Sequence, residues 1–185
     1  MKKLLTILSL CALGLTLLTC VGCQEDNNLA LSNHDKKLQA VTKEVQAKKT
    51  TDKALLLVSF GSTWDKPQET FKKIQARFKE QFPDRDLYFS FTSEICMTRC
   101  GQKGWNYYSP NFYLEALGAA GYKDIAVQSL HIVPGEEFLR VKNYIKDFRN
   151  NGEHPEFAKT TVYLAGPLLE TEEDCERVAA ELHKI

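Results

Sequence analysis

The chain has 185 residues, and its 24 Lys and Arg residues balance its 24 Asp and Glu residues, so it carries no net charge at neutral pH. A neutral chain lacks the basic face on which nucleic-acid binding depends, so nucleic acid is not expected as a partner. The length allows one ordinary domain with a sizeable core.

The first residues have the layout of an export signal. Lys2 and Lys3 precede a short apolar run, and small residues and cysteines follow it. The run is too short to cross a bilayer as a helix, which needs roughly 20 residues. We therefore expect residues 1–23 to be a secretory signal peptide.

The end of this signal resembles the lipobox of bacterial lipoproteins. The matching residues are Val21-Gly22-Cys23, although Cys20 stands where leucine is usual. The resemblance implies that Cys23 is lipidated and anchors an exported protein to a bacterial membrane, in the periplasm or outer envelope. A plain cleaved signal without a lipid is the alternative.

The next segment is polar. Residues 24–52 are rich in Lys, Gln, Asn and Thr, with a few apolar residues near 38–45 that would allow a transient helix. The segment has too little apolar surface to fold alone, so we expect a tether. The globular domain is then residues 53–185.

Strands and helices alternate in this domain. The first predicted strand, 54–59, is a continuous apolar run, which is typical of a strand buried on both faces. Asp65 is expected to cap the helix that follows it, and Gly121 to end a later one. The alternation predicts an α/β fold with a mostly parallel four-stranded sheet flanked by helices. The other predicted strands are 87–92, 124–130 and 160–165, and the predicted helices are 67–82, 109–120, 136–149 and 171 onward.

Polar residues and glycines follow the ends of these strands. Since parallel strands end at one edge of the sheet, we expect a ligand site at that edge. Alternatively, these residues lie together only because the parallel topology brings all strand ends to one edge, and the glycines only form turns, as in any α/β protein. The candidate binding residues are Ser59, Phe60, Gly61, Ser62, Thr92, Ser93, His131, Gly135 and Glu136, with Glu137 as the candidate catalytic residue.

His131 and the acidic pair after it have two interpretations. Imidazole and carboxylate groups suit Co²⁺, Ni²⁺ or Fe²⁺, so His131 is a candidate metal ligand. Alternatively, His131 is a hydrogen-bonded histidine at a strand end, and Glu136 and Glu137 favour a helix N-terminus.

The stretch from Cys96 to Tyr113, which begins after the second strand and runs into the next helix, contains cysteines and aromatic residues. Cys96 and Cys100 lie four residues apart and Cys175 is distant, which permits one disulfide and one free thiol but is not a zinc pattern. The aromatic side chains would suit a flat macrocycle, or would pack a long loop over the sheet. They are Trp105, Tyr107, Tyr108, Phe112 and Tyr113.

Several motifs of the predicted domain share one resemblance: Ser59-Phe60-Gly61-Ser62, Val127-Gln128-Ser129-Leu130-His131-Ile132, Gly135-Glu136-Glu137-Phe138 and Gly166-Pro167-Leu168-Leu169. Together they resemble one family, the anaerobic-type sirohydrochlorin cobaltochelatases. The similarity covers essentially all of residues 53–180, in order and with similar spacing. The resemblance implies one lobe of a two-lobed chelatase fold, the first of two family halves. The second half of the family supplies a Gly-His-Gly element and a later metal-binding histidine, for which no counterpart is found here.

The resemblance implies that the protein inserts Co²⁺, or Fe²⁺ or Ni²⁺ in its place, into a tetrapyrrole for cobalamin-type biosynthesis. In this role Glu137 is the acidic residue that faces the cleft, and two copies would pair as a homo-oligomer to rebuild two lobes. One alternative is an envelope lipoprotein that binds haem or another tetrapyrrole without inserting metal. Another is an inactive, truncated copy.

Overall fold

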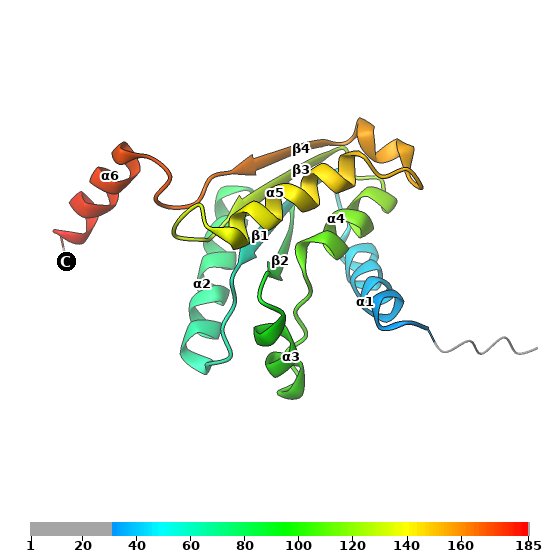
Figure 1. Ribbon diagram of the computed structural model, residues 1–185, viewed down its shortest axis with the longest axis horizontal. Helices are drawn as coiled ribbons and strands as arrows, with labels where there is room; N and C mark the ends of the chain where they lie inside the picture. The colour runs from blue at the N-terminus through cyan, green and yellow to red at the C-terminus, as the bar shows by residue number, and fades with distance from the viewer. Residues whose placement is uncertain (1–30, 185) are drawn as a thin grey trace, which may run out of the picture. The chain divides into compact units, whose positions relative to one another are not determined.

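The computed structural model describes residues 31–184 (Figure 1). The predicted signal peptide, the predicted lipidation site Cys23 and the first part of the predicted tether lie outside these residues. Within residues 31–184, none of the helices has the length and apolar character needed to span a membrane.

A parallel sheet with the strand order β2-β1-β3-β4 forms the centre of the domain. Its middle strand β1 alternates between two apolar clusters: Leu56 and Val58 belong to one, and Leu55 and Leu57 to the other. Both faces of β1 are therefore covered, which explains its continuous apolar sequence. The predicted α/β fold with a four-stranded parallel sheet is confirmed. The strands are β1 (Lys53–Ser59), β2 (Asp86–Phe91), β3 (Asp124–Ser129) and β4 (Thr161–Ala165).

Helices on the two faces of the sheet enclose these clusters (Figure 1). Helices α1, α4 and α5 pack against one face, while α2 and α3 pack against the other. The last helix, α6, has no buried residue. The helices are α1 (Asn33–Lys48), α2 (Asp65–Gln81), α3 (Glu94–Gln102), α4 (Pro110–Ala119), α5 (Glu136–Arg149), the short 3₁₀ helix η1 (Pro155–Lys159) and α6 (Glu172–Leu182).

Helix α1 differs from the prediction of a polar tether. Val41 and Val45 are fully buried, and Leu38 packs against the same cluster. These three residues form a narrow apolar stripe at helical spacing, which is enough to dock a helix although it could not fold alone. Ser32 and Asp35 form a capping box at its start. The prediction of a tether is therefore wrong for this segment.

Two further details of the prediction are corrected. The stretch after β2, which was expected to be a long loop, contains α3, and Ser93 caps this helix by accepting a hydrogen bond from the backbone of Cys96. Asp65 is the first residue of α2 rather than its cap, and Trp64 at the cap position makes no side-chain capping bond. The expected end of α4 is confirmed, because Gly121 has a φ of 79°.

The three cysteines of the described residues are all free thiols. Cys100 is buried, Cys96 is half-buried and Cys175 is exposed. Burial raises the pKa of the Cys100 thiol, with a smaller contribution from neighbouring Cys96. Cys96 and Cys100 do share α3, as their spacing indicated, but no group of three or more His, Cys, Asp or Glu in the described part of the chain could hold a metal ion.

Candidate functional site

His131 lies just beyond the end of β3 and is 8% exposed. Its Nδ1 is 2.9 Å from the hydroxyl of Ser129, and its Nε2 is 3.3 Å from the hydroxyl of Thr92 at the end of β2. The backbone N–H of His131 also donates to the Ser129 hydroxyl, at 3.2 Å. The ring orientation is thus fixed by two strands of the sheet.

The surroundings of His131 favour the neutral imidazole. Burial lowers the pKa of His131, and the carboxylate of Glu137 opposes this effect by raising it. Both ring nitrogens already contact hydroxyl groups, so a metal ion would have to displace one of them. The Thr92 contact is the longer of the two and is the one more easily displaced. A metal-binding role of His131 stays a prediction.

Glu137 is the second residue of α5 and is held beside the end of β2. Its carboxylate is 3.5 Å from the guanidinium of Arg140, and the same guanidinium nitrogen is 3.5 Å from the carbonyl oxygen of Thr92. These are long contacts, so Arg140 restrains Glu137 only loosely. Thr92 therefore connects His131, through its hydroxyl, with the Glu137–Arg140 pair, through its carbonyl.

Glu136 and Gly135 take simpler positions at the start of α5. Gly135 is the N-cap residue and has an extended backbone, and Glu136 is exposed. Carboxylates at this end of a helix interact favourably with its dipole. Glu136 and Glu137 therefore stabilise the N-terminus of α5, and this effect is compatible with a catalytic role of Glu137.

The loop after β1 approaches the end of β2 very closely. Thr92 N–H donates to the carbonyl of Ser59 at 2.9 Å, and Ser93 N–H donates to the carbonyl of Phe60 at 3.1 Å. Gly61 has a φ of 103°, and a Cβ there would lie 2.6 Å from the ring of Phe91. Glycine is therefore required for this loop by both backbone conformation and space.

Ser62 contacts α2 and α3 through its backbone. Its carbonyl oxygen accepts hydrogen bonds from the side chains of Gln68 at 2.7 Å and Cys100 at 3.3 Å. These backbone contacts fasten the loop to α2 and α3, and the Ser62 hydroxyl accepts a hydrogen bond from the backbone N–H of Trp64 at 3.3 Å. Ser59 likewise uses its hydroxyl within the loop, accepting from the Gly61 N–H at 3.2 Å.

Backbone hydrogen bonds also join the exits of β3 and β4. Leu168 N–H donates to the carbonyl of His131 at 2.9 Å, and Leu169 N–H donates to that of Ile132 at 2.8 Å. Large apolar side chains that are 49% to 75% exposed follow the strand ends along this edge. We call this set the apolar rim: Phe60, Trp64, Ile95, Ile132, Val133 and Leu168.

Sequence reasoning missed two residues of the site, Ser129 and Arg140. Ser129 is part of the motif that runs from Val127 to Ile132, but nothing in the sequence showed that its hydroxyl would turn toward His131. Arg140 lies three residues after Glu137, a spacing that places both on one side of a helix and could have indicated the pair.

The burial of neutral His131 predicts a pH-dependent stability. Its pKa is lower in the folded chain than the value of about 6.5 expected for an unfolded one, so its contribution is present above that value and is lost as pH falls through the folded pKa. We expect the urea-unfolding free energy to fall from about pH 7 to about pH 5. His131→Gln should reduce this slope, whereas the exposed His183→Gln should keep it. An unchanged slope in His131→Gln would show that another group causes the dependence.

The aromatic residues between Trp105 and Tyr113 largely belong to the core. Tyr107 stacks on Phe91 with ring centroids 3.9 Å apart, and Tyr113 and Phe112 are buried. The packing interpretation therefore accounts for most of these rings.

Comparisons with known protein families and with curated proteins agree on one family. The model of the cobalt chelatase (CbiK) family matches residues 53–185. A sirohydrochlorin cobaltochelatase of Salmonella typhimurium is 35% identical over 124 residues, which are 66% of this chain and 44% of that protein. The sirohydrochlorin cobaltochelatase CbiKC of Nitratidesulfovibrio vulgaris is 32% identical over 132 residues, which are 71% of this chain and 45% of that protein.

The chain thus spans less than half the length of these curated relatives. Among solved structures, a CbiX protein described for cobalamin (vitamin B12) biosynthesis, from Marinobacter aquaeolei VT8, gives a TM-score of 0.45 at 18% identity. The alignment covers 72% of this chain and 99% of that one. A score at this level carries no inference about activity.

Proposed function

Because this chain belongs to the cobalt chelatase (CbiK) family, we propose that it takes part in inserting Co²⁺ into sirohydrochlorin. The observation that carries the proposal is the family match over residues 53–185, which includes the whole strand-end site. The metal and the ring are substrates that meet at this edge of the sheet. The similarity to two sirohydrochlorin cobaltochelatases favours cobalt, and it lends no support to iron, nickel or haem.

The strand-end site offers groups suited to this reaction. Insertion of a divalent metal into a tetrapyrrole displaces pyrrole N–H protons, which a base must accept. The carboxylate of Glu137 lies at the edge of the sheet with 26% of its side chain exposed, within reach of a bound molecule. His131 supplies an imidazole whose orientation is fixed by Ser129 and Thr92, and Arg140 loosely restrains the Glu137 carboxylate.

The apolar rim supports binding of the ring. A tetrapyrrole has two flat apolar faces, and contact with exposed side chains such as Phe60 and Ile132 would remove apolar surface from water. The rim of one chain can contact only one face of the ring, and its side chains are 49% to 75% exposed, so we propose that a second copy of the chain covers the opposite face. The homo-oligomer would then be the active form, and the rate per chain would rise with protein concentration.

Ring binding is tested by titrating the purified chain with sirohydrochlorin and, separately, with haem, while following absorbance. The proposal expects saturable binding of sirohydrochlorin and weaker binding of haem. Tight haem binding without sirohydrochlorin binding would instead favour the haem-holding alternative.

We also propose that the chain is a lipoprotein of the cell envelope, anchored through Cys23. The support is the sequence Val21-Gly22-Cys23 after a short apolar run. In a bacterial host we expect Cys23→Ser to remove labelling by a palmitate analogue and to release the protein from the membrane fraction. Cys20→Ser, three residues earlier, should keep both. Continued labelling of Cys23→Ser would rule out this anchor.

A further inference from the structure

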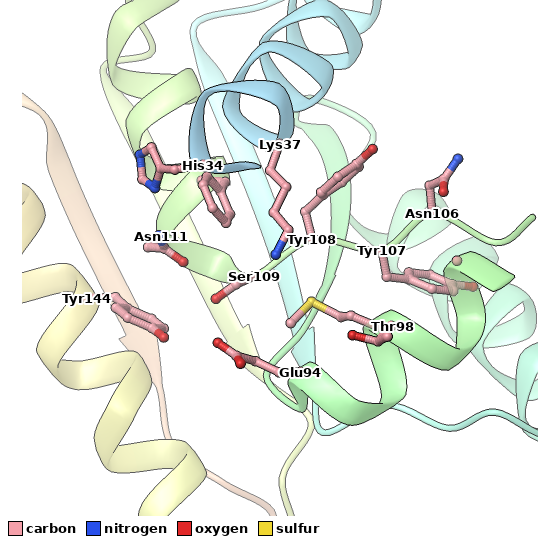
Figure 2. Close-up of a pocket in the computed structure, with 13 residues that line it drawn as sticks. His34, Lys37, Glu94, Thr98, Asn106, Tyr107, Tyr108, Ser109, Asn111 and Tyr144 are labelled. Atoms are coloured by element: carbon pink, nitrogen blue, oxygen red, sulfur yellow. The ribbon is translucent and has the colours of Figure 1, made fainter. Parts of the chain in front are cut away.

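A cavity of about 430 Å³ lies between α1, α3, α4 and α5 (Figure 2). Its volume is in the range of small-molecule sites. Neither His131 nor Glu137 lines it, so it is distinct from the strand-end site. One wall comes from α1, which lies outside the residues matched by the family model.

Two opposite charges face this cavity. Lys37 extends into it from α1, and Glu94 faces it from the start of α3 on the other side (Figure 2). Among residues 31–184, neither side chain takes part in an ion pair. The hydroxyl of Tyr144 on α5 points toward the carboxylate of Glu94 (Figure 2). The cavity therefore has a cationic side and an acidic side.

The surface between the two charges is partly apolar. Phe112, which is 8% exposed, and the thioether of Met97 line it, together with polar groups of Ser109 and Asn111. The ring of His34 lies 5.0 Å from that of Phe112, which fixes the start of α1 against α4. The walls are thus held by contacts between elements that are distant in the sequence.

We propose that this cavity binds a small bipolar molecule with an aromatic body. Its carboxylate would meet the ammonium group of Lys37, and its ammonium group would meet the carboxylate of Glu94 and the hydroxyl of Tyr144. Hydrogen bonds between charged groups are stronger than neutral ones and would fix the orientation. The aromatic body would pack on Phe112 and Met97. Small-molecule sites commonly combine such apolar walls with a few precisely placed polar groups.

The test uses 4-(aminomethyl)benzoate as the probe and isothermal titration calorimetry as the measurement. Benzoate lacks the ammonium group and benzylamine lacks the carboxylate, so each should bind about tenfold or more weakly than the bipolar probe. Equal affinity for all three molecules, or no saturable binding of the bipolar probe, would overturn the proposal.

Substitutions locate the binding in this cavity. Lys37→Met and Glu94→Gln should each weaken binding of the bipolar probe about tenfold, whereas the neighbouring exposed Lys36→Met should not. Thermal unfolding of each variant shows whether it is folded. If the folded variants bind like the parent chain, the cavity is not the site. Because the test needs neither cobalt nor a tetrapyrrole, its result is independent of the chelatase proposal.

Discussion

Replacing Glu137 with glutamine is expected to lower the rate of cobalt insertion about a hundredfold, the loss typical when a general base is removed. The amide cannot accept a pyrrole proton, but it keeps the shape of the carboxylate and a contact for Arg140 at the start of α5. Affinity for sirohydrochlorin should therefore change by only about twofold, because the ring is held mainly by other groups. The insertion rate and the ring affinity are both measured by absorbance.

Glu80→Gln is the matched control for this change. Glu80 lies on α2 in an exposed pair with Arg77, 3.8 Å apart, and has no part in the site. Its rate should equal that of the parent chain. If Glu137→Gln inserts cobalt as fast as Glu80→Gln, Glu137 does not accept the proton, and His131 becomes the remaining base at this edge.

Replacing Asp86 with alanine is expected to destabilise the fold by about 2–4 kcal/mol, because it leaves the buried Tyr122 hydroxyl and the partly buried backbone donors of Thr50 and Thr51 without their acceptor. Asp86 at the start of β2 is 4% exposed. Its carboxylate accepts hydrogen bonds from the backbone of Thr50 and Thr51 at 2.9 and 3.2 Å, and from the hydroxyl of Tyr122 at 2.6 Å. It thus joins the segment after α1 to the sheet.

The stabilisation of the fold by the Asp86 carboxylate depends on pH. Burial raises the pKa of Asp86, but the hydrogen bonds from Thr50 and Tyr122 lower it more, so the net pKa is below the usual value. Its stabilisation is therefore present above about pH 4 and is lost as pH falls through the folded pKa. Urea unfolding at several pH values measures both effects. Asp84→Ala, at an exposed position paired with Lys53, should change little. An equal loss in both variants would contradict the assigned network.

The sheet was predictable because each strand carries its own signal. The apolar run of β1, the periodic apolar residues of the helices and the glycine at 121 placed the four strands and the helices α2, α4, α5 and α6 to within about two residues, whereas α3 was missed. Helix α1 was not predictable in this way, because its two buried valines are few for its length. Their burial depends on α4, which lies far along the chain. The capping box at Ser32 and Asp35 was the local signal that could have placed its start.

The site was predictable as a location but not as a set of contacts. The topology places Thr92 and His131 at the same edge, since parallel strands end together. Which hydroxyls contact the imidazole depends on the register of β3 beside β1 and on side-chain rotamers, and neither can be derived from spacing. The cavity between α1 and α3 was also beyond prediction, because it exists only once α1 has docked.

The rate of cobalt insertion into sirohydrochlorin by the purified chain tests the central claim most directly. The absorbance change should be faster than in a protein-free control. The initial rate per chain should rise with chain concentration if two copies enclose the ring. A rate equal to that of the control at every concentration, with the protein folded, would contradict the proposal that this chain takes part in cobalt insertion.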